Sequence, residues 1–399
     1  MNIAIYTLTS ELHDEQAVNS VTKDFLGSLG VDYEMKGSDY TDYGTHALDL
    51  IYVRTGGSEG IFKRLLPQLC QQFNRPFYLL TSGKSNSLAA SLEILSFLRQ
   101  QQIDGEVIHG STEYVRQRIT LLARVGEARQ QLKGAKFGVI GEPSDWLISS
   151  SVNRQVIADR LGINIVDVPM SALMDAIRMI PLSTSLERSE REEIQRALPG
   201  AHQIYGALRF LVERYQLQGF TLRCFDLLTA VKNTGCLALA KLNAEGVIAG
   251  CEGDVPAMLT MIITKALTGF SGFQCNPSRI DPETGEILFA HCTIPLNMVE
   301  RYEFDTHFES GIGVGVRGYM KEGPVTIFKV AGDLSRCFIA EGELVRNEAK
   351  PDLCRTQQVI QLTDKSQISY FLNDPIGNHH VIMSGHNKEV LSELIYNKV

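Results

Sequence analysis

The feature that most constrains this fold is the alternation of short apolar runs with helix-like segments over the first two thirds of the 399-residue chain. Residues 2–7, 48–53 and 76–80 are typical of buried strands, and each is followed by turn residues and a segment with helical spacing of apolar side chains. Such alternation builds a parallel sheet with helices on both faces. We therefore predict a Rossmann-like, doubly wound α/β domain over residues 1–133.

The alternation then repeats. A helix from residue 112 to about 133 leads to a strand at 136–141, and further strands are expected at 164–168, at 220–225 and from Val247. Helices are expected at 171–179 and within the charge-rich stretch 185–215. This pattern predicts a second doubly wound α/β domain over residues 134–268.

The character of the sequence changes after Gly269. Short β-type runs at 273–276, 286–294, 325–330 and 358–362 are separated by turns, with little helix before the last dozen residues. We predict a mostly antiparallel, barrel-like β domain over residues 269–399.

Composition excludes several classes of function. The formal net charge of −8 argues against a nucleic-acid partner, which would need a basic face. No apolar run is long enough to span a bilayer, and the N-terminus starts a strand with no basic leader region. The eight cysteines form no CxxC pair, which is typical of free thiols in a reducing compartment. We expect a cytoplasmic protein.

The segment 247–259 holds the first candidate site residues. It reads as an apolar strand, a Gly/acid turn and a helix with proline in its first turn. Ligands of α/β sheets gather beyond the carboxyl ends of the strands, where Glu252 and Asp254 fall. Asp254 is also a good helix cap. Glu252 follows an apolar strand and needs a partner, which a metal bound to downstream histidines could supply.

Four histidines lie in segments that also carry glycine, asparagine or acid, and with Glu252 they form a candidate site for manganese, iron or zinc: His291, His307, His379 and His380. If residues 305–309 form a strand, His307 and Glu309 share a face. By the same rule His379 and His380 face opposite ways, so one of them reaches the metal. The lone Trp146, on a loop after a strand, is either a packing anchor or a face on which a sugar stacks.

At these residues a family resemblance becomes specific. The motifs CEGDVPAMLTM, NPSRIDPETGEILFAHCTIP, HFESGIGVGVRG, GPVTIFKV and GNHHVIMSGH resemble the C-terminal halves of the L-fucose isomerase and L-arabinose isomerase superfamily, and especially the short fucose isomerase-like proteins. The resemblance covers roughly residues 220–390. It implies a Mn²⁺-dependent aldose–ketose isomerase of a small sugar, assembled as a homo-oligomer, a trimer or hexamer, in which one subunit closes another's site.

The resemblance also implies roles for individual residues. Glu252 falls on the first carboxylate ligand, His307 on the histidine before a Gly-Ile-Gly run, and the segment 378–380 on the last histidine ligand. His291 stands where those isomerases have the second acid, so Glu309 or Asp254 could replace the missing carboxylate.

The leading hypothesis is therefore a metal-dependent isomerase that acts on a pentose or deoxyhexose through an ene-diol. Its catalytic residues are Glu252, His291 and Glu309, its metal ligands are Glu252 and the four histidines, and its substrate-binding residues are Trp146, Asp254 and Asn378. The alternatives are a non-catalytic sugar- or metal-sensing protein on the same fold and, third, a metal lyase or epimerase that uses the same enediolate.

Overall fold

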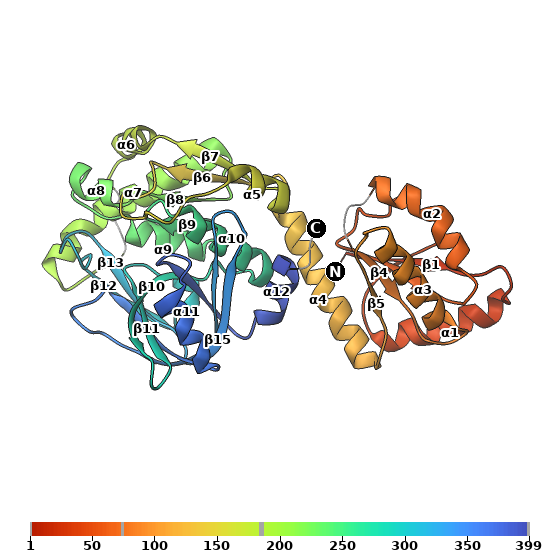
Figure 1. Ribbon diagram of the computed structural model, residues 1–399. Helices are drawn as coiled ribbons and strands as arrows, with labels where there is room; N and C mark the ends of the chain where they lie inside the picture. The colour runs from red at the N-terminus through yellow and green to blue at the C-terminus, as the bar shows by residue number, and fades with distance from the viewer. Residues whose placement is uncertain (1, 73–75, 183–186, 397–399) are drawn as a thin grey trace. The chain divides into compact units, whose positions relative to one another are not determined.

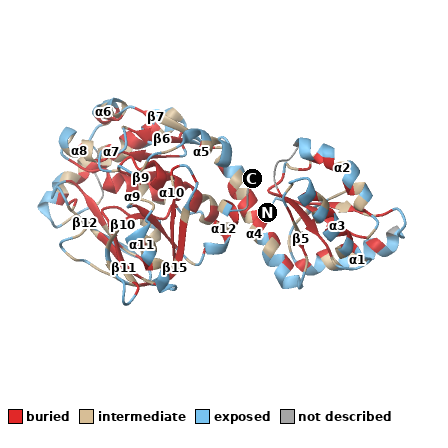
Figure 2. Ribbon diagram, in the orientation of Figure 1, coloured by how far each residue is buried: buried red, intermediate tan, exposed pale blue. Residues whose placement is uncertain are grey.

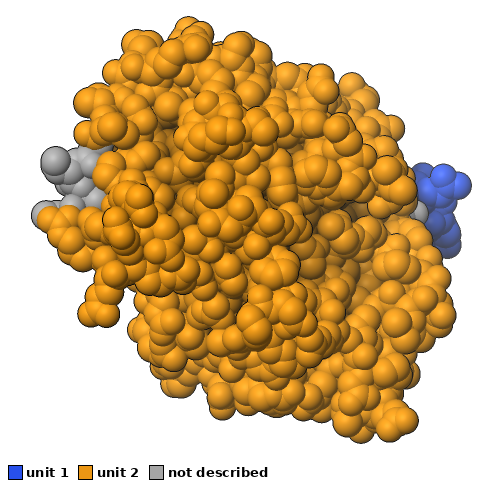
Figure 3. Space-filling view, turned by 90° about the vertical axis from the view of Figure 1, so that its left-hand side faces the viewer, with its two compact units in different colours: residues 1–131, 392–399 blue, residues 132–391 orange. Residues whose placement is uncertain are grey.

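The computed structural model describes residues 2–72, 76–182 and 187–396. The chain divides into two compact units, Met1–Gln131 with Ser392–Val399 and Leu132–Leu391, which Figure 3 colours separately. None of the helices in the described ranges has both the length and the apolar character that a membrane crossing requires. All eight cysteines, each within those ranges, are free thiols, as predicted.

The described part of the first unit contains a five-stranded parallel sheet in the order β2-β1-β3-β4-β5. Its strands and helices are β1 (Ile3–Leu8), α1 (Glu15–Leu29), β2 (Glu34–Gly37), β3 (Leu48–Val53), α2 (Glu59–Gln72), β4 (Phe77–Leu80), α3 (Ser87–Gln100), β5 (Gly105–Ile108) and α4 (Thr112–Leu132). Alternate residues of β1 pack into separate apolar clusters, with Ile5 in one and Tyr6 in the other. Both faces of the sheet are therefore covered, as the doubly wound prediction required.

The second unit begins with another parallel sheet, four-stranded in the described residues, in the order β7-β6-β8-β9. Its elements are β6 (Lys136–Ile140), α5 (Arg154–Leu161), β7 (Asn164–Val168), α6 (Met170–Met179), α7 (Glu192–Tyr215), β8 (Gly219–Leu222), α8 (Phe225–Ala230), α9 (Cys236–Ala244), β9 (Ile248–Cys251) and α10 (Val255–Thr268). Strand β8 ends three residues earlier than predicted, because Phe225 already starts α8. Part of the helical stretch expected at 185–215 lies outside the described residues.

The rest of the second unit is a closed β-barrel in the order β10-β11-β16-β15-β14-β17, beside a two-stranded ribbon of β12 and β13. The elements are β10 (Phe273–Asp281), β11 (Glu286–His291), β12 (Arg301–Asp305), β13 (Gly315–Tyr319), β14 (Gly323–Val330), β15 (Cys337–Asn347), β16 (Thr356–Leu362), α11 (Ile368–Asn373), β17 (His380–Ser384) and the short 3-10 helices η1 (Leu296–Met298) and η2 (Lys365–Gln367). The last helix, α12 (Lys388–Tyr396), begins in this unit and belongs to the first unit from Ser392 on. Every barrel pairing is antiparallel, which confirms the predicted fold class.

Helices α9 and α10 lie between the four-stranded sheet and the barrel (Figure 1). They are apolar on nearly every face and buried along most of their length (Figure 2), as expected for helices covered on all sides. Helix α10 contacts β9 of the sheet and both β14 and β17 of the barrel. The start of α10 therefore brings the end of a sheet strand close to the barrel, where the candidate site forms.

Candidate metal centre

Glu252 occupies the first position after β9 and has an unusual backbone conformation. Its φ of 64° lies in the left-handed region, which non-glycine residues seldom adopt. The next residue, Gly253, also has a positive φ, and Asp254 then caps α10 by accepting a hydrogen bond from the Ala257 backbone N–H. The chain thus reverses between strand and helix within three residues, with the Glu252 side chain at the turn.

The loop after β6 packs directly onto this turn. A Cβ atom on Gly253 would lie 2.6 Å from the carbonyl oxygen of Glu142, so only glycine allows this approach. The Ser144 backbone N–H donates to the Glu252 carbonyl, and Trp146 Nε1 donates to Glu252 Oε2 at 2.7 Å. Trp146 is half exposed and therefore flanks the carboxylate on an accessible side.

Two histidines from the barrel face the other carboxylate oxygen. Glu252 Oε1 lies 3.4 Å from His379 Nε2 and 3.7 Å from His291 Nε2. His291 ends β11, and His379 immediately precedes β17. These three buried residues form the one group among the described residues whose metal-ligating atoms all lie within 4.8 Å of one another. One carboxylate and two imidazoles suit a first-row divalent ion.

Asp254 fixes the orientation of His379. The ring Nδ1 donates to Asp254 Oδ2 at 2.8 Å, and both side chains are fully buried. A carboxylate on one ring nitrogen sets the tautomer and turns the other nitrogen toward a metal. In agreement, His379 Nε2 is buried and makes no hydrogen bond to the described residues. The donor set thus fits a metal.

The electrostatics of the site are dominated by opposite charges in close contact. Burial would raise the pKa of Glu252, but His291 and His379 outweigh burial and hold that pKa below its usual range. Burial would lower the pKa of His379, whereas the carboxylates of Asp254 and Glu252 raise it to about 9. Glu252 is therefore ionised at neutral pH, and His379 is protonated until a competing cation arrives.

His307 borders this group and does not join it. Its ring contacts Phe225 edge-on, with centroids 5.5 Å apart, and Phe225 contacts Trp146 in the same way at 4.7 Å. Its Nδ1 lies 3.0 Å from Ser310 Oγ. Burial, and then the neighbouring His291, lower the pKa of His307 to about 4, so the ring is neutral at physiological pH.

The expectation that His307 and Glu309 share a strand face is wrong. Strand β12 ends at Asp305, and residues 308–310 form a turn in which the Gly311 N–H donates to the His307 carbonyl. Period-two alternation does not apply to a turn, and Glu309 is exposed. A catalytic role for Glu309 stays a prediction without this geometric support.

The assignment of His380 as a ligand also needs correction. Its Nδ1 donates to the Asn378 carbonyl, and its Nε2 lies 3.0 Å from the Tyr370 hydroxyl, so both ring nitrogens are occupied. The ring packs against Phe371 and is fully buried, and burial lowers its pKa to about 3. As alternation predicted, only one of the two neighbouring histidines faces the centre, and it is His379.

The residues predicted to bind substrate differ in access. Trp146 and Asn378 are exposed, whereas Asp254 is fully buried behind His379 and reaches the site only through that ring. Sequence reasoning missed Lys329, whose Nζ lies 3.9 Å from Asp254 Oδ2. Its signal was a single lysine in the otherwise apolar end of strand β14, residues 327–330.

Comparison with known proteins gives distant relatives that are all sugar isomerases. The chain is 22% identical to the sulfoquinovose isomerase of Priestia aryabhattai over 328 residues, which cover 77% of this chain and 73% of that protein. It is 23% identical to the sulfoquinovose isomerase of Alkalicoccus urumqiensis over 61% of this chain, and spans only 59% of that relative's length. The enzyme of the same name from Clostridium sp. (strain MSTE9) is 24% identical over 54% of this chain and 49% of its own. No family model matches the chain.

Proposed function

We propose that this protein is a metal-dependent aldose–ketose isomerase whose cation is held by Glu252, His291 and His379. The observation that carries the proposal is the buried group of one carboxylate and two imidazoles, with Asp254 on the far nitrogen of His379. Distant homology to sulfoquinovose isomerases supports the reaction class. Mn²⁺ is the ion we expect.

The residues of the chain have separable tasks in this proposal. Bound Mn²⁺ would supply a Lewis acid for the carbonyl and hydroxyl oxygens at C1 and C2 of the open-chain sugar. Glu252 is ionised, and its Oε2 is held by Trp146, so its carboxylate keeps one orientation while it moves a proton between C2 and C1 through an ene-diol. The exposed indole of Trp146 covers a sugar face.

The mechanism also needs a second group that carries a proton. The group formed by the described residues contains no second carboxylate. The family resemblance implies that His291 stands in the place of that acid. With one ring nitrogen as a ligand, an imidazole keeps a second nitrogen that can carry a proton, and His291 Nδ1 makes no hydrogen bond to the described residues. We propose His291 for this role, with Glu309 as the competitor. Glu309→Gln and His291→Gln, assayed with saturating Mn²⁺, decide between them by which one loses turnover.

The first substrate to test is sulfoquinovose, because the distant relatives are named for it. Other deoxyhexoses and pentoses follow. Purified protein is analysed for bound metal and then assayed for ketose formation with and without chelator. We expect Mn²⁺-dependent turnover that Glu252→Gln abolishes, because the change removes both the ligand charge and the base. Metal and sugar binding without any turnover would instead identify a sensor.

A further inference from the structure

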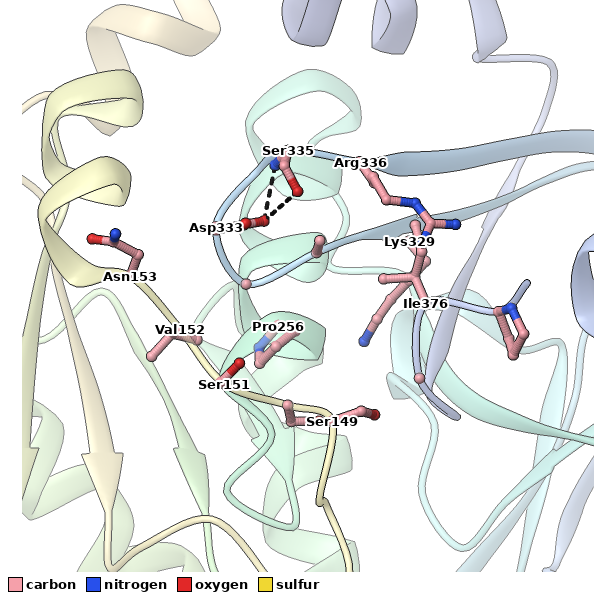
Figure 4. Close-up of a pocket in the computed structure, with 15 residues that line it drawn as sticks. Ser149, Ser151, Val152, Asn153, Pro256, Lys329, Asp333, Ser335, Arg336 and Ile376 are labelled. Carbon is pink, nitrogen blue, oxygen red and sulfur yellow. Dashed lines mark hydrogen bonds between the residues drawn. The ribbon is translucent and has the colours of Figure 1, made fainter.

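A cavity of about 470 Å³ lies within the second unit, beside the candidate metal centre. Its walls come from the loop after β6 (residues 149–153), the first turn of α10 at Pro256, the end of β14 with the loop that follows it, and residues 375–377 (Figure 4). Loop, helix and strand side chains thus enclose a space that is separate from the three candidate ligands.

Three of these four segments also carry the metal centre. Trp146, which donates to Glu252, comes three residues before Ser149 of the wall. Asp254 comes two residues before Pro256, and His379 two residues after Gly377. The fourth segment contributes Lys329, which is within 3.9 Å of Asp254. These links along the chain, and the 3.9 Å between Lys329 Nζ and Asp254 Oδ2, put the cavity next to the residue that orients His379.

Lys329 is the distinctive group of the cavity. It is only 2% exposed, and Figure 4 shows its side chain running from β14 into the cavity toward Pro256. Its ammonium has three N–H donors, yet Nζ makes no hydrogen bond to the residues that the structure describes, and its ion pair with Asp254 is 3.9 Å long. A buried, incompletely paired ammonium is costly, so an acceptor in the cavity would relieve it.

The rest of the lining favours an anion. Ser149 and Ser151 offer hydroxyl donors, and the N-terminus of α5 meets the cavity at Asn153 with the positive end of its dipole.

Two charged residues of the lining are already engaged within their own surroundings. Asp333 accepts from the Ser335 backbone N–H and hydroxyl, at 3.0 and 2.6 Å. Arg336 pairs with Asp374 at 2.5 Å. Of the two basic residues of the lining, Lys329 therefore has the longer ion pair, 3.9 Å against 2.5 Å for Arg336, while Asp333 keeps its negative charge.

We propose that this cavity binds an anionic group such as a sulfonate, phosphate or carboxylate, with Lys329 as its principal donor. This part of the proposal rests on the proposed function. We assign the anionic group to the far end of the sugar, whose carbonyl end lies at Glu252, His291 and His379. The enzyme would then select sugars with a terminal anion. A free inorganic anion has the same chemistry and is the alternative ligand of this cavity.

The first test measures sulfate binding, which needs no turnover. Titration of the full chain with sodium sulfate against chloride at equal ionic strength should give saturable binding. We expect Lys329→Met to weaken this binding at least about 10-fold, because a hydrogen bond to a charged donor is lost. The control is Lys265→Met. Lys265 lies near the C-terminus of α10, the helix that packs against β14 and whose first turn lines the cavity, so its loss should leave sulfate affinity unchanged.

The second test compares sulfoquinovose with its neutral 6-deoxy counterpart. Lys329→Met should raise KM for the sulfonated sugar roughly 10- to 100-fold and leave KM for the neutral sugar within about twofold. Lys329→Arg should retain most of the preference. If Lys329→Met fails to fold, the exposed pair Ser149→Ala with Ser151→Ala replaces it, with a smaller shift in the same direction.

The outcomes separate the two proposals. If neither sugar is converted, the proposed isomerase fails, and loss of sulfate binding in Lys329→Met still establishes the anion cavity. If sulfate binds but Lys329→Met raises KM equally for both sugars, the assignment of the cavity to the anionic end of the substrate is overturned. Wild-type protein that binds no sulfate and shows no preference for the sulfonated sugar overturns the cavity proposal itself.

Discussion

At the scale of single residues, the strain at Glu252 marks the site. A non-glycine residue in the left-handed region costs about 1–3 kcal/mol and persists only where its surroundings hold it. Here the Ser144 N–H holds the Glu252 carbonyl and Trp146 holds its carboxylate. The conformation is therefore maintained by the same loop that flanks the candidate substrate position.

Asp254 caps α10 and also pairs with two buried basic side chains, His379 and Lys329. Asn caps helices as well as Asp does, but Asp254→Asn leaves both basic groups without their carboxylate partner and should lower the free energy of unfolding by about 3–5 kcal/mol. It should also weaken Mn²⁺ affinity by about 10- to 100-fold, because the amide no longer holds the His379 ring as a carboxylate does. Calorimetric titration with Mn²⁺ and denaturant unfolding measure the two effects.

The matched control is Asp14→Asn. Asp14 caps α1 by accepting from the Ala17 N–H in the same way, and no histidine among the described residues contacts its carboxylate. Equal Mn²⁺ affinity in Asp254→Asn and wild-type protein would contradict a role for Asp254 in orienting the ligand.

Metal affinity should depend on pH through His379. Its pKa of about 9 in the metal-free protein exceeds the usual 6.5, so the ring carries a proton that Mn²⁺ must displace. Mn²⁺ affinity should therefore rise between pH 6 and pH 8, by up to about tenfold per pH unit. The raised pKa also stabilises the metal-free protein below pH 6.5, and this contribution is lost as the pH rises through 9. An affinity that stays constant from pH 6 to pH 8 would refute the assignment.

Trp146 provides a built-in spectroscopic reporter. It is the one tryptophan in the sequence, and its indole N–H is bonded to Glu252. Mn²⁺ binding to Glu252 should change the environment of the indole and hence its fluorescence, with a midpoint equal to the calorimetric affinity. The signal should disappear in Glu252→Gln. A fluorescence titration that is indifferent to this substitution would show that the metal binds elsewhere.

Sequence reasoning could place the ligand-bearing segments but not every side chain. Glu252 was recognisable because a carboxylate follows an apolar strand. Strand alternation indicated that only one of His379 and His380 reaches the centre, but it did not say which. His307 and Glu309 were misplaced because the turn at 308–310 depends on the Gly311 N–H bond to His307. Lys329 stood out as a lysine among apolar residues, but its partner Asp254 could not be predicted, because it lies on an element distant in the sequence.

At the scale of elements, the junction of β9 and α10 controls the site, and Gly253 tests it. Gly253→Ala would place a Cβ 2.6 Å from the Glu142 carbonyl in a backbone region unfavourable to alanine. We expect the free energy of unfolding to fall by about 1–3 kcal/mol. Mn²⁺ affinity should also fall, because the loop that carries Trp146 must move away. Thermal unfolding and Mn²⁺ titration measure both changes.

Gly269, at the other end of α10, is the control. It also has a positive φ, but apart from its chain neighbours no described residue lies within 4 Å of the position that a Cβ would take. Gly269→Ala should cost about 1 kcal/mol of backbone strain and leave Mn²⁺ affinity intact. If both substitutions reduce affinity equally, the close approach of the loop has no part in metal binding.

The elements themselves were largely predictable because their apolar periods are strong. Buried strands such as β3 and the amphipathic helix α4 appear within one or two residues of their expected bounds. The closure of the barrel was less accessible, because the β14–β17 pairing joins segments about fifty residues apart through backbone hydrogen bonds that leave no local pattern.

At the scale of the whole molecule, the assembly is the remaining prediction. The resemblance to fucose and arabinose isomerases implies a trimer or hexamer, which sedimentation velocity at micromolar concentration would detect. We expect a mass of three or six chains, independent of dilution over about tenfold, as for an interface of standard size or larger. A stable monomer with full activity would contradict this prediction and confine the site to a single chain.

The adjacency of His379 and His380 has a consequence for how such a protein can vary. Cys275 of β10 pairs with His380, and Phe328 of β14 pairs with the next residue, so the register of β17 is fixed from both sides. Deleting or inserting one residue between Gly377 and His380 would exchange the directions of the two imidazoles, and would place one in the aromatic core and the other beyond reach of Glu252. Natural variants should therefore differ by substitution here, whereas changes of length should accumulate in surface turns such as residues 281–285.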